Sequence, residues 1–142
     1  MNLINVLADS FPCLTLPVSL REIKDLAETI LTGLAAGSAN LDILITGDRA
    51  MKDYNFRFLG LKSTTNVLSF PQNEDEQQGL RGQLIINIDA VRRESLLYGQ
   101  PPFACLTRLM VHGILHLAGY EHGFEMESMA QELEMLCLNC AL

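Results

Sequence analysis

The chain has 142 residues, 49% of them hydrophobic and 19% charged, and its size and composition predict one globular domain over residues 1–142. Its apolar runs are far shorter than the roughly 20 residues that a membrane-spanning helix needs, and its N-terminus carries no basic leader, so we expect a cytoplasmic protein without a membrane helix. The formal net charge of −7 argues against a generally basic surface for nucleic acid but leaves room for a local patch of cations.

Hydrophobic periodicity divides the chain into short strands and amphipathic helices. Ser19 and Glu22 have the spacing of a capping box at a helix start, and Gly37 is a natural stop for that helix. Asp48 and Asp89 are expected to cap two later helices. In chain order, the sequence predicts a strand at 3–7, a helix at 19–37, a strand at 41–46, a helix at 48–60, a strand at 66–71, a polar loop at 72–82, a strand at 83–88, and helices at 89–99, 103–119 and 125–139.

These four strands and about five helices, with no internal repeat, predict an α+β fold in which the helices pack on a small mixed four-stranded sheet. Strands that precede and follow single helices suggest that the sheet is at least partly parallel. The order of the strands is not readable from the sequence.

All three histidines of the chain lie within eleven residues, in the stretch VHGILHLAGYEHG. His112 and His116 are four residues apart, so on a helix their imidazoles project from one face, one turn apart. Gly119 can take the left-handed conformation that ends a helix, which lets the chain turn back and bring His122 to the same point. The pattern predicts a zincin-like metal helix with three nitrogen ligands and an open fourth position. Zn²⁺ is favoured by its availability, and other divalent transition metals also suit three imidazoles.

The histidine spacing is that of the HExxHxxGxxH zinc proteases, but Gly113 stands where their catalytic glutamate would be. Glycine cannot take a proton, so another residue, the substrate or a metal hydroxide must serve as the base. Glu121, next to His122, is a candidate for moving a proton or orienting a ligand, and a solvated surface side chain is the alternative interpretation.

Two stretches of the chain resemble motifs of a known family. HGILHLAGYEH resembles the HGxLHLxGYDH signature of the YbeY endoribonucleases, also called rRNA maturation factors. TNVLSFP at 65–71 resembles that family's T(D/N)VLSFP block, and GQLIIN at 82–87 falls where the family usually has GD followed by a strand. The blocks occur in the family's order and span roughly residues 40–123.

The resemblance implies a single-strand-specific, metal-dependent endoribonuclease of bacteria. Its substrate would be single-stranded RNA, in the maturation of the 16S rRNA 3′ end and in ribosome quality control, with ribosomal particles as partners. It also implies an α+β fold and zinc held by His112, His116 and His122. Asn66, in the TNVLSFP block, is a candidate for binding the substrate, because alternate residues of a strand project to one face.

The chain also departs from the family pattern. The family commonly has an LNxxYRG stretch before T(D/N)VLSFP, and an ungapped alignment places Leu59 where its arginine belongs. Arg57, two residues earlier, is the candidate replacement, with a surface charge as the alternative. Gln83 stands where the family usually has an aspartate, and Glu121 replaces the aspartate of YDH. These departures leave the metal ligands intact and concern the catalytic details.

Two other functions stay open from the sequence. One is a non-catalytic ribosome-assembly factor in which the metal only stabilises the fold, consistent with an acidic chain that lacks the expected arginine and glutamate. The other is a metallohydrolase of a different substrate, to which the missing HExxH glutamate is an objection. Cleavage of single-stranded rRNA by the metal-loaded protein separates the endoribonuclease from both alternatives.

Overall fold

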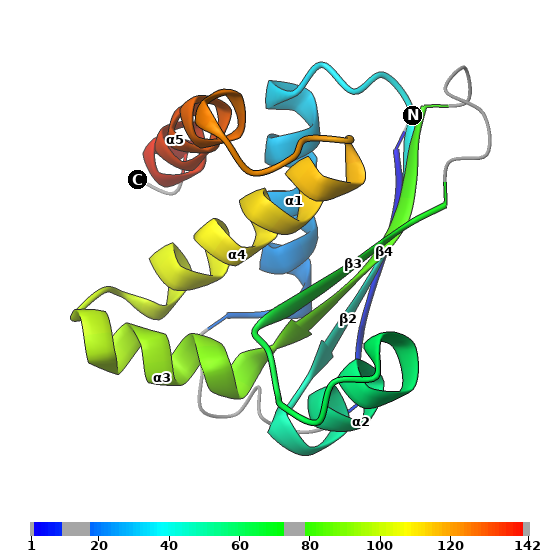
Figure 1. Ribbon diagram of the computed structural model, residues 1–142. Coiled ribbons are helices and arrows are strands. Elements are labelled where there is room, and N and C mark those ends of the chain that lie inside the picture. Colours follow the sequence, from blue (N-terminus) through cyan, green and yellow to red (C-terminus); the bar gives the residue numbers. More distant parts are fainter. Residues whose placement is uncertain (1, 10–17, 73–78, 141–142) are drawn as a thin grey trace.

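The computed structural model describes residues 2–9, 18–72 and 79–140, which form four strands and five helices (Figure 1). The predicted α+β fold is confirmed. Residues 73–78 of the loop predicted at 72–82 lie outside the described ranges, and its last three residues belong to a strand. None of the described helices is long and apolar enough to cross a membrane. The elements are β1 (Leu3–Ala8), α1 (Leu20–Gly33), β2 (Ala39–Thr46), α2 (Asp48–Leu59), β3 (Val67–Pro71), β4 (Leu80–Asn87), α3 (Ile88–Tyr98), α4 (Pro102–Leu117) and α5 (Phe124–Cys140).

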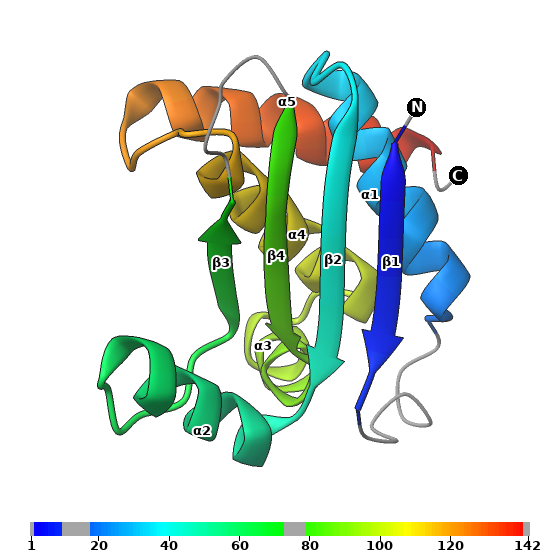
Figure 2. The same cartoon turned by 90° about the vertical axis from the view of Figure 1, so that its right-hand side faces the viewer.

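The described strands form one sheet in the order β1-β2-β4-β3. β1, β2 and β4 run parallel, and the edge strand β3 is antiparallel to β4. Parallel neighbours need a crossover connection, and α1 joins β1 to β2 in this way. Figure 2 shows the sheet face-on, with α1, α4 and α5 behind it. The mixed sheet confirms the partly parallel pairing predicted from the sequence.

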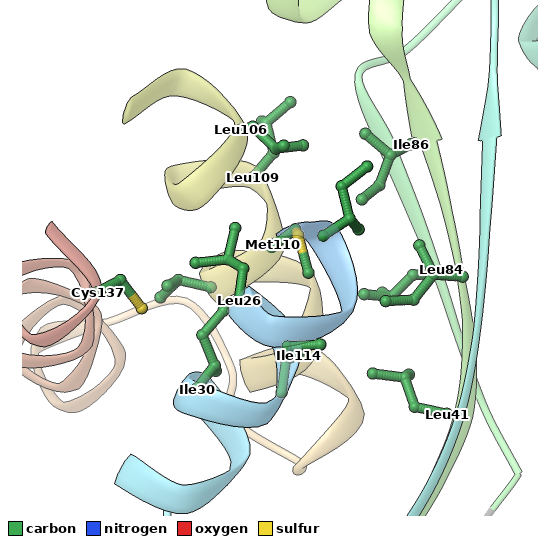
Figure 3. Close-up of a cluster of buried hydrophobic side chains, with 14 of the residues drawn as sticks. Leu26, Ile30, Leu41, Leu84, Ile86, Leu106, Leu109, Met110, Ile114 and Cys137 are labelled. Atoms are coloured by element: carbon green, nitrogen blue, oxygen red, sulfur yellow. The ribbon is translucent and has the colours of Figure 1, made fainter. Parts of the chain in front are cut away.

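The core lies between the sheet and the helices α1, α4 and α5. Leu41 of β2 and Leu84 of β4 meet Ile30 of α1 and Met110 and Ile114 of α4 (Figure 3). All five side chains are fully buried, and each contributes roughly 1.5–3 kcal/mol through the hydrophobic effect. Helix α4 packs against β3, β4, α1, α3 and α5. These contacts on most sides hold α4 firmly and therefore position the side chains that it carries.

Helix α1 begins as predicted and ends earlier. The hydroxyl of Ser19 accepts from the N–H of Glu22, whose carboxylate accepts from the N–H of Ser19, so the capping box is confirmed. The helix ends at Gly33 rather than at Gly37. The reason is Ala35, which with a φ of 52° takes the left-handed conformation that turns the chain away from the helix.

The prediction that Asp48 and Asp89 are N-caps is wrong. The N-caps of α2 and α3 are Gly47 and Asn87. A carboxylate oxygen of Asp89 accepts from the backbone N–H of Asp48 at 2.9 Å, so α3 supplies the acceptor that Gly47 lacks. Asn87 accepts from the N–H of Asp89 at 3.0 Å and donates to the carboxylate of Asp48 at 2.7 Å. The aspartates join the starts of two helices through tertiary contacts that local patterns do not encode.

Candidate active site

The end of α4 and the loop that follows bring the three histidines to one pocket. Helix α4 ends at Leu117, and Gly119, with a φ of 93°, turns the chain as predicted. The turn places the ring of His122 at a centroid distance of 4.8 Å from the ring of His116. His112, one turn earlier on α4, lines the same pocket, which has a volume of about 640 Å³. We call it the histidine pocket.

The surroundings of His116 and His112 affect different properties of the two rings: the orientation of His116 and the pKa of His112. Nδ1 of His116 lies 3.2 Å from the carbonyl oxygen of Tyr120. Because a carbonyl can only accept, this contact is a hydrogen bond when Nδ1 carries a proton, and in the neutral ring Nε2 is then the acceptor. Burial lowers the pKa of His112; Glu134 opposes this shift, while His116 and Arg108 add to it. Neutral imidazoles are the form that binds a metal ion.

This donor set suits a transition metal, but the side chains as they stand do not surround one point. Within residues 2–9, 18–72 and 79–140, no three His, Cys, Asp or Glu side chains are grouped closely enough to hold an ion. His122 is exposed on the loop after α4, so packing does not fix its rotamer. Three imidazoles on one pocket, one of them oriented by a carbonyl, offer the type of donors that a metal ion takes, and binding an ion there would require the side chains to move.

Gly113 lies where α4 packs on the sheet. A Cβ atom there would be 2.8 Å from Cδ2 of Leu84 and 3.2 Å from Cγ2 of Val67, closer than ordinary contacts. The hydroxyl of Ser69 donates to the carbonyl oxygen of Gly113 at 3.1 Å and ties β3 to the same turn of α4. The position therefore has no room for the glutamate of the zinc proteases, and glycine serves the packing of the helix instead.

Comparison with known proteins identifies the family. The family described as Endoribonuclease YbeY matches residues 15–139. The Endoribonuclease YbeY of Oleidesulfovibrio alaskensis is 36% identical over 138 residues, covering 82% of this chain and 82% of the relative. This chain belongs to the YbeY endoribonuclease family.

One further relative and one solved structure extend the comparison. The Endoribonuclease YbeY of Geobacter sulfurreducens is 34% identical over 122 residues and covers 83% of this chain and 81% of its own. The solution structure of TM1509 from Thermotoga maritima superposes with a TM-score of 0.67 at 21% identity, over 96% of this chain and 90% of that one. The similarity to the TM1509 structure shows a shared fold.

The departures from the YbeY pattern fall at different places around the sheet. Leu59 lines the histidine pocket and is 54% exposed. Arg57 is exposed in the last turn of α2 and is not among the described residues that line the pocket. Gln83 faces away from α4, because its neighbour Leu84 packs toward that helix. The structure thus brings Leu59 to the histidines but neither Arg57 nor Gln83, and a catalytic role for Arg57 stays a prediction.

Asn66 and Glu121, the other two candidates, lie at and beside the histidine pocket. Asn66 lines it just before β3, and its Nδ2 donates to Oε1 of Glu94 at 3.1 Å. Glu121 is exposed and lines a neighbouring hollow, formed by residues 118–125, together with His122. The binding role of Asn66 and the proton-transfer role of Glu121 stay predictions.

Arg108 also lines the histidine pocket, although the sequence motifs do not single it out. The signal was its spacing, since Arg108 precedes His112 by four residues and shares its face of α4. It is the one Lys or Arg among the described residues that line the pocket. Its Nη2 donates to Oε2 of Glu94 at 3.0 Å, and its Nη1 donates to Oε1 of Gln100 at 3.1 Å. The pocket therefore combines three imidazoles with one guanidinium that α3 holds in place.

Proposed function

We propose that this protein is a single-strand-specific, metal-dependent endoribonuclease that matures the 3′ end of 16S rRNA and takes part in ribosome quality control. Its membership of the YbeY family supports endonucleolytic cleavage of RNA. The observation that carries the metal dependence is the position of His112, His116 and His122 on one pocket. The substrate is 16S rRNA, met on ribosomal particles in the cytoplasm.

His112, His116 and His122 would hold Zn²⁺ or another divalent transition metal. Such an ion, when bound, polarises a phosphate oxygen and lowers the pKa of water. His116 presents Nε2 to the pocket's ligand because its Nδ1 faces the carbonyl of Tyr120. Burial lowers the pKa of His112 and so favours the neutral ring, which is the form that coordinates a metal. Gly113 contributes the close packing of α4 on the sheet between the turns that carry His112 and His116.

The position of the pocket suits single-stranded RNA. It is lined by residues 66–71 at the edge of the sheet and by α4. A single strand can present its phosphates and splayed bases to such an edge, whereas the bases of an A-form duplex are enclosed in the helix. With a net charge of −7, the protein has no general attraction for RNA, so its affinity is expected to depend on a few local contacts.

Cleavage of a labelled RNA that carries the 3′ end of 16S rRNA tests the proposal. The metal-loaded protein is expected to cut the single strand and to leave the same sequence intact once it is annealed to its complement. Removal of the metal with a chelator, or His116→Ala, is expected to abolish cutting, and added Zn²⁺ restores cutting to the chelated wild type alone. Ser128→Ala, at an exposed position of α5, is the matched control for an alanine substitution outside the pocket.

The alternative functions have distinct outcomes in the same experiment, with folding of each variant checked by circular dichroism. Metal-loaded wild-type protein that cuts no single-stranded rRNA fragment would overturn the proposal. Binding to ribosomal particles without cleavage would identify a non-catalytic assembly factor. Hydrolysis of an unstructured peptide would identify a metallohydrolase of another substrate. Cleavage that survives both chelation and His116→Ala would remove the metal from the mechanism.

A further inference from the structure

We propose that Arg108 is the cation of the histidine pocket that contacts the RNA phosphate and that Glu94 positions it; this inference rests on the proposed ribonuclease function. Arg108 lies one helical turn before His112, and no other Lys or Arg among the described residues lines this pocket. Cleavage of a phosphodiester develops negative charge at the phosphate, and a fixed cation beside it lowers the barrier. Leu59, in the pocket wall, offers no charge, so Arg108 is the available group.

Three neighbours fix the guanidinium of Arg108. It donates to Glu94 at 3.0 Å and to Gln100 at 3.1 Å, and its Cζ lies 5.7 Å from the centre of the Tyr98 ring. These hydrogen bonds use two of the five N–H donors of an arginine, so further donors can serve a phosphate. A guanidinium held in this way loses little conformational freedom when it binds a ligand.

Glu94 connects Arg108 to the other side of the pocket. One of its carboxylate oxygens accepts from Arg108, and the other accepts from Nδ2 of Asn66 at 3.1 Å. This carboxylate of α3 therefore spans α4 and the residue before β3. The side chains of Arg108 and Glu94 are 30% and 22% exposed, so the ion pair is partly shielded from water but still reachable. Glu94 acts through Arg108 and is a positioning residue.

The same ion pair has a structural alternative, in which it only joins α3 to α4. Loss of either partner would then weaken the fold to a similar extent and leave RNA binding unchanged. The proposal instead predicts an asymmetry, because Arg108 carries the charge that meets RNA and Glu94 only holds that charge in place.

The salt dependence of RNA binding by metal-free protein, measured beside cleavage by metal-loaded protein, distinguishes these roles. Loss of one contact to a phosphate of single-stranded RNA reduces the slope of the log binding constant against log salt concentration by about 0.7. Arg108→Gln is expected to show this reduction and a roughly 100-fold lower kcat. Arg108→Lys keeps the charge without the planar fork, so it keeps the slope and loses part of kcat. Glu94→Gln is expected to keep the slope and to lose less of kcat than Arg108→Gln.

Arg92→Gln is the matched control, because Arg92 is an exposed cation of α3 outside the pocket lining, and both of its readouts are expected to match those of the wild type. An unchanged slope and kcat in Arg108→Gln, where the wild type cleaves RNA, would refute the role of Arg108 and leave the proposed function standing. Equal losses of thermal stability in Arg108→Gln and Glu94→Gln, with an unchanged slope, would identify a structural ion pair. A wild type that cleaves no RNA would refute the proposed function, while the binding slope would still decide the role of Arg108.

Chemical protection provides a readout on the wild-type protein if Arg108→Gln does not fold. Arg108 is partly exposed and is expected to react with an arginine-specific dicarbonyl reagent. Bound single-stranded RNA is expected to protect it, as measured by mass spectrometry, while Arg92 stays reactive. Equal modification of Arg108 with and without RNA would contradict the proposal.

Discussion

Gly113 lets α4 lie directly on β3 and β4, and we expect Gly113→Ala to destabilise the protein. In an exposed helix the same substitution would stabilise by about 1 kcal/mol, because glycine is that much poorer a helix former than alanine. Here the added Cβ would lie 2.8 Å from Leu84 and 3.2 Å from Val67. Leu84 is fully buried and cannot move aside without disturbing the core, and such overpacking costs about 1–3 kcal/mol.

The two effects sum to a net loss of about 1 kcal/mol in the free energy of unfolding. A loss of this size lowers the Tm of a protein of this length by roughly 3 °C. Urea denaturation followed by circular dichroism measures the change. Ser128→Gly and Ser128→Ala, at an exposed position of α5, give the helix-propensity difference in the same protein. If Gly113→Ala were stabilised by that full difference, Leu84 and Val67 would have yielded without cost, and the packing argument would be refuted.

Metal binding by the three histidines, the Asp48 ion pair and Leu59 each provide another test. Zn²⁺ at about 100 times its dissociation constant is expected to raise the free energy of unfolding by about 2.7 kcal/mol, measured as a higher Tm in calorimetry. A rise that persists in His116→Ala would place the ion elsewhere. The pKa of Asp48 is lowered mainly by hydrogen bonds from Arg93, with burial opposing the shift and Asn87 adding to it. Because the folded-state pKa of Asp48 lies below its unfolded value, its stabilisation is present above the ordinary aspartate pKa and is lost as the pH falls through the folded-state value. Asp48→Asn is therefore expected to lower the free energy of unfolding near neutral pH by less than about 1 kcal/mol, because the ion pair is so exposed. The plots of Tm against pH for variant and wild type should converge in acid. Parallel plots would contradict a stabilising role for the Asp48 carboxylate. Leu59→Arg adds a cation at an exposed position of the pocket wall and is expected to steepen the salt dependence of RNA binding by about 0.7, whereas an unchanged slope would show that RNA does not pass this residue.

Features that depend on neighbours in the chain were predictable from the sequence. The spacing of His112 and His116 and the turn at Gly119 were sufficient to predict that His122 shares their pocket. The reason is that the geometry of one helix and its C-terminal turn follows from local conformation. The periodicity of apolar residues likewise predicted the number and type of the elements, and the motifs predicted the family.

The contacts between distant segments were decided only by the tertiary structure. The reason for glycine at 113 is the approach of Leu84 and Val67, and periodicity shows which face of α4 is apolar but not what packs on it. The ion pair of Arg108 with Glu94 depends in the same way on the packing of α3 against α4. Which candidate cation reaches the histidines is a question of three-dimensional position, and Arg108 lines the pocket whereas Arg57 does not. The sequence thus determined the histidine set and the family, and the fold decided which other side chains surround these histidines, because such contacts arise only when separate elements pack together.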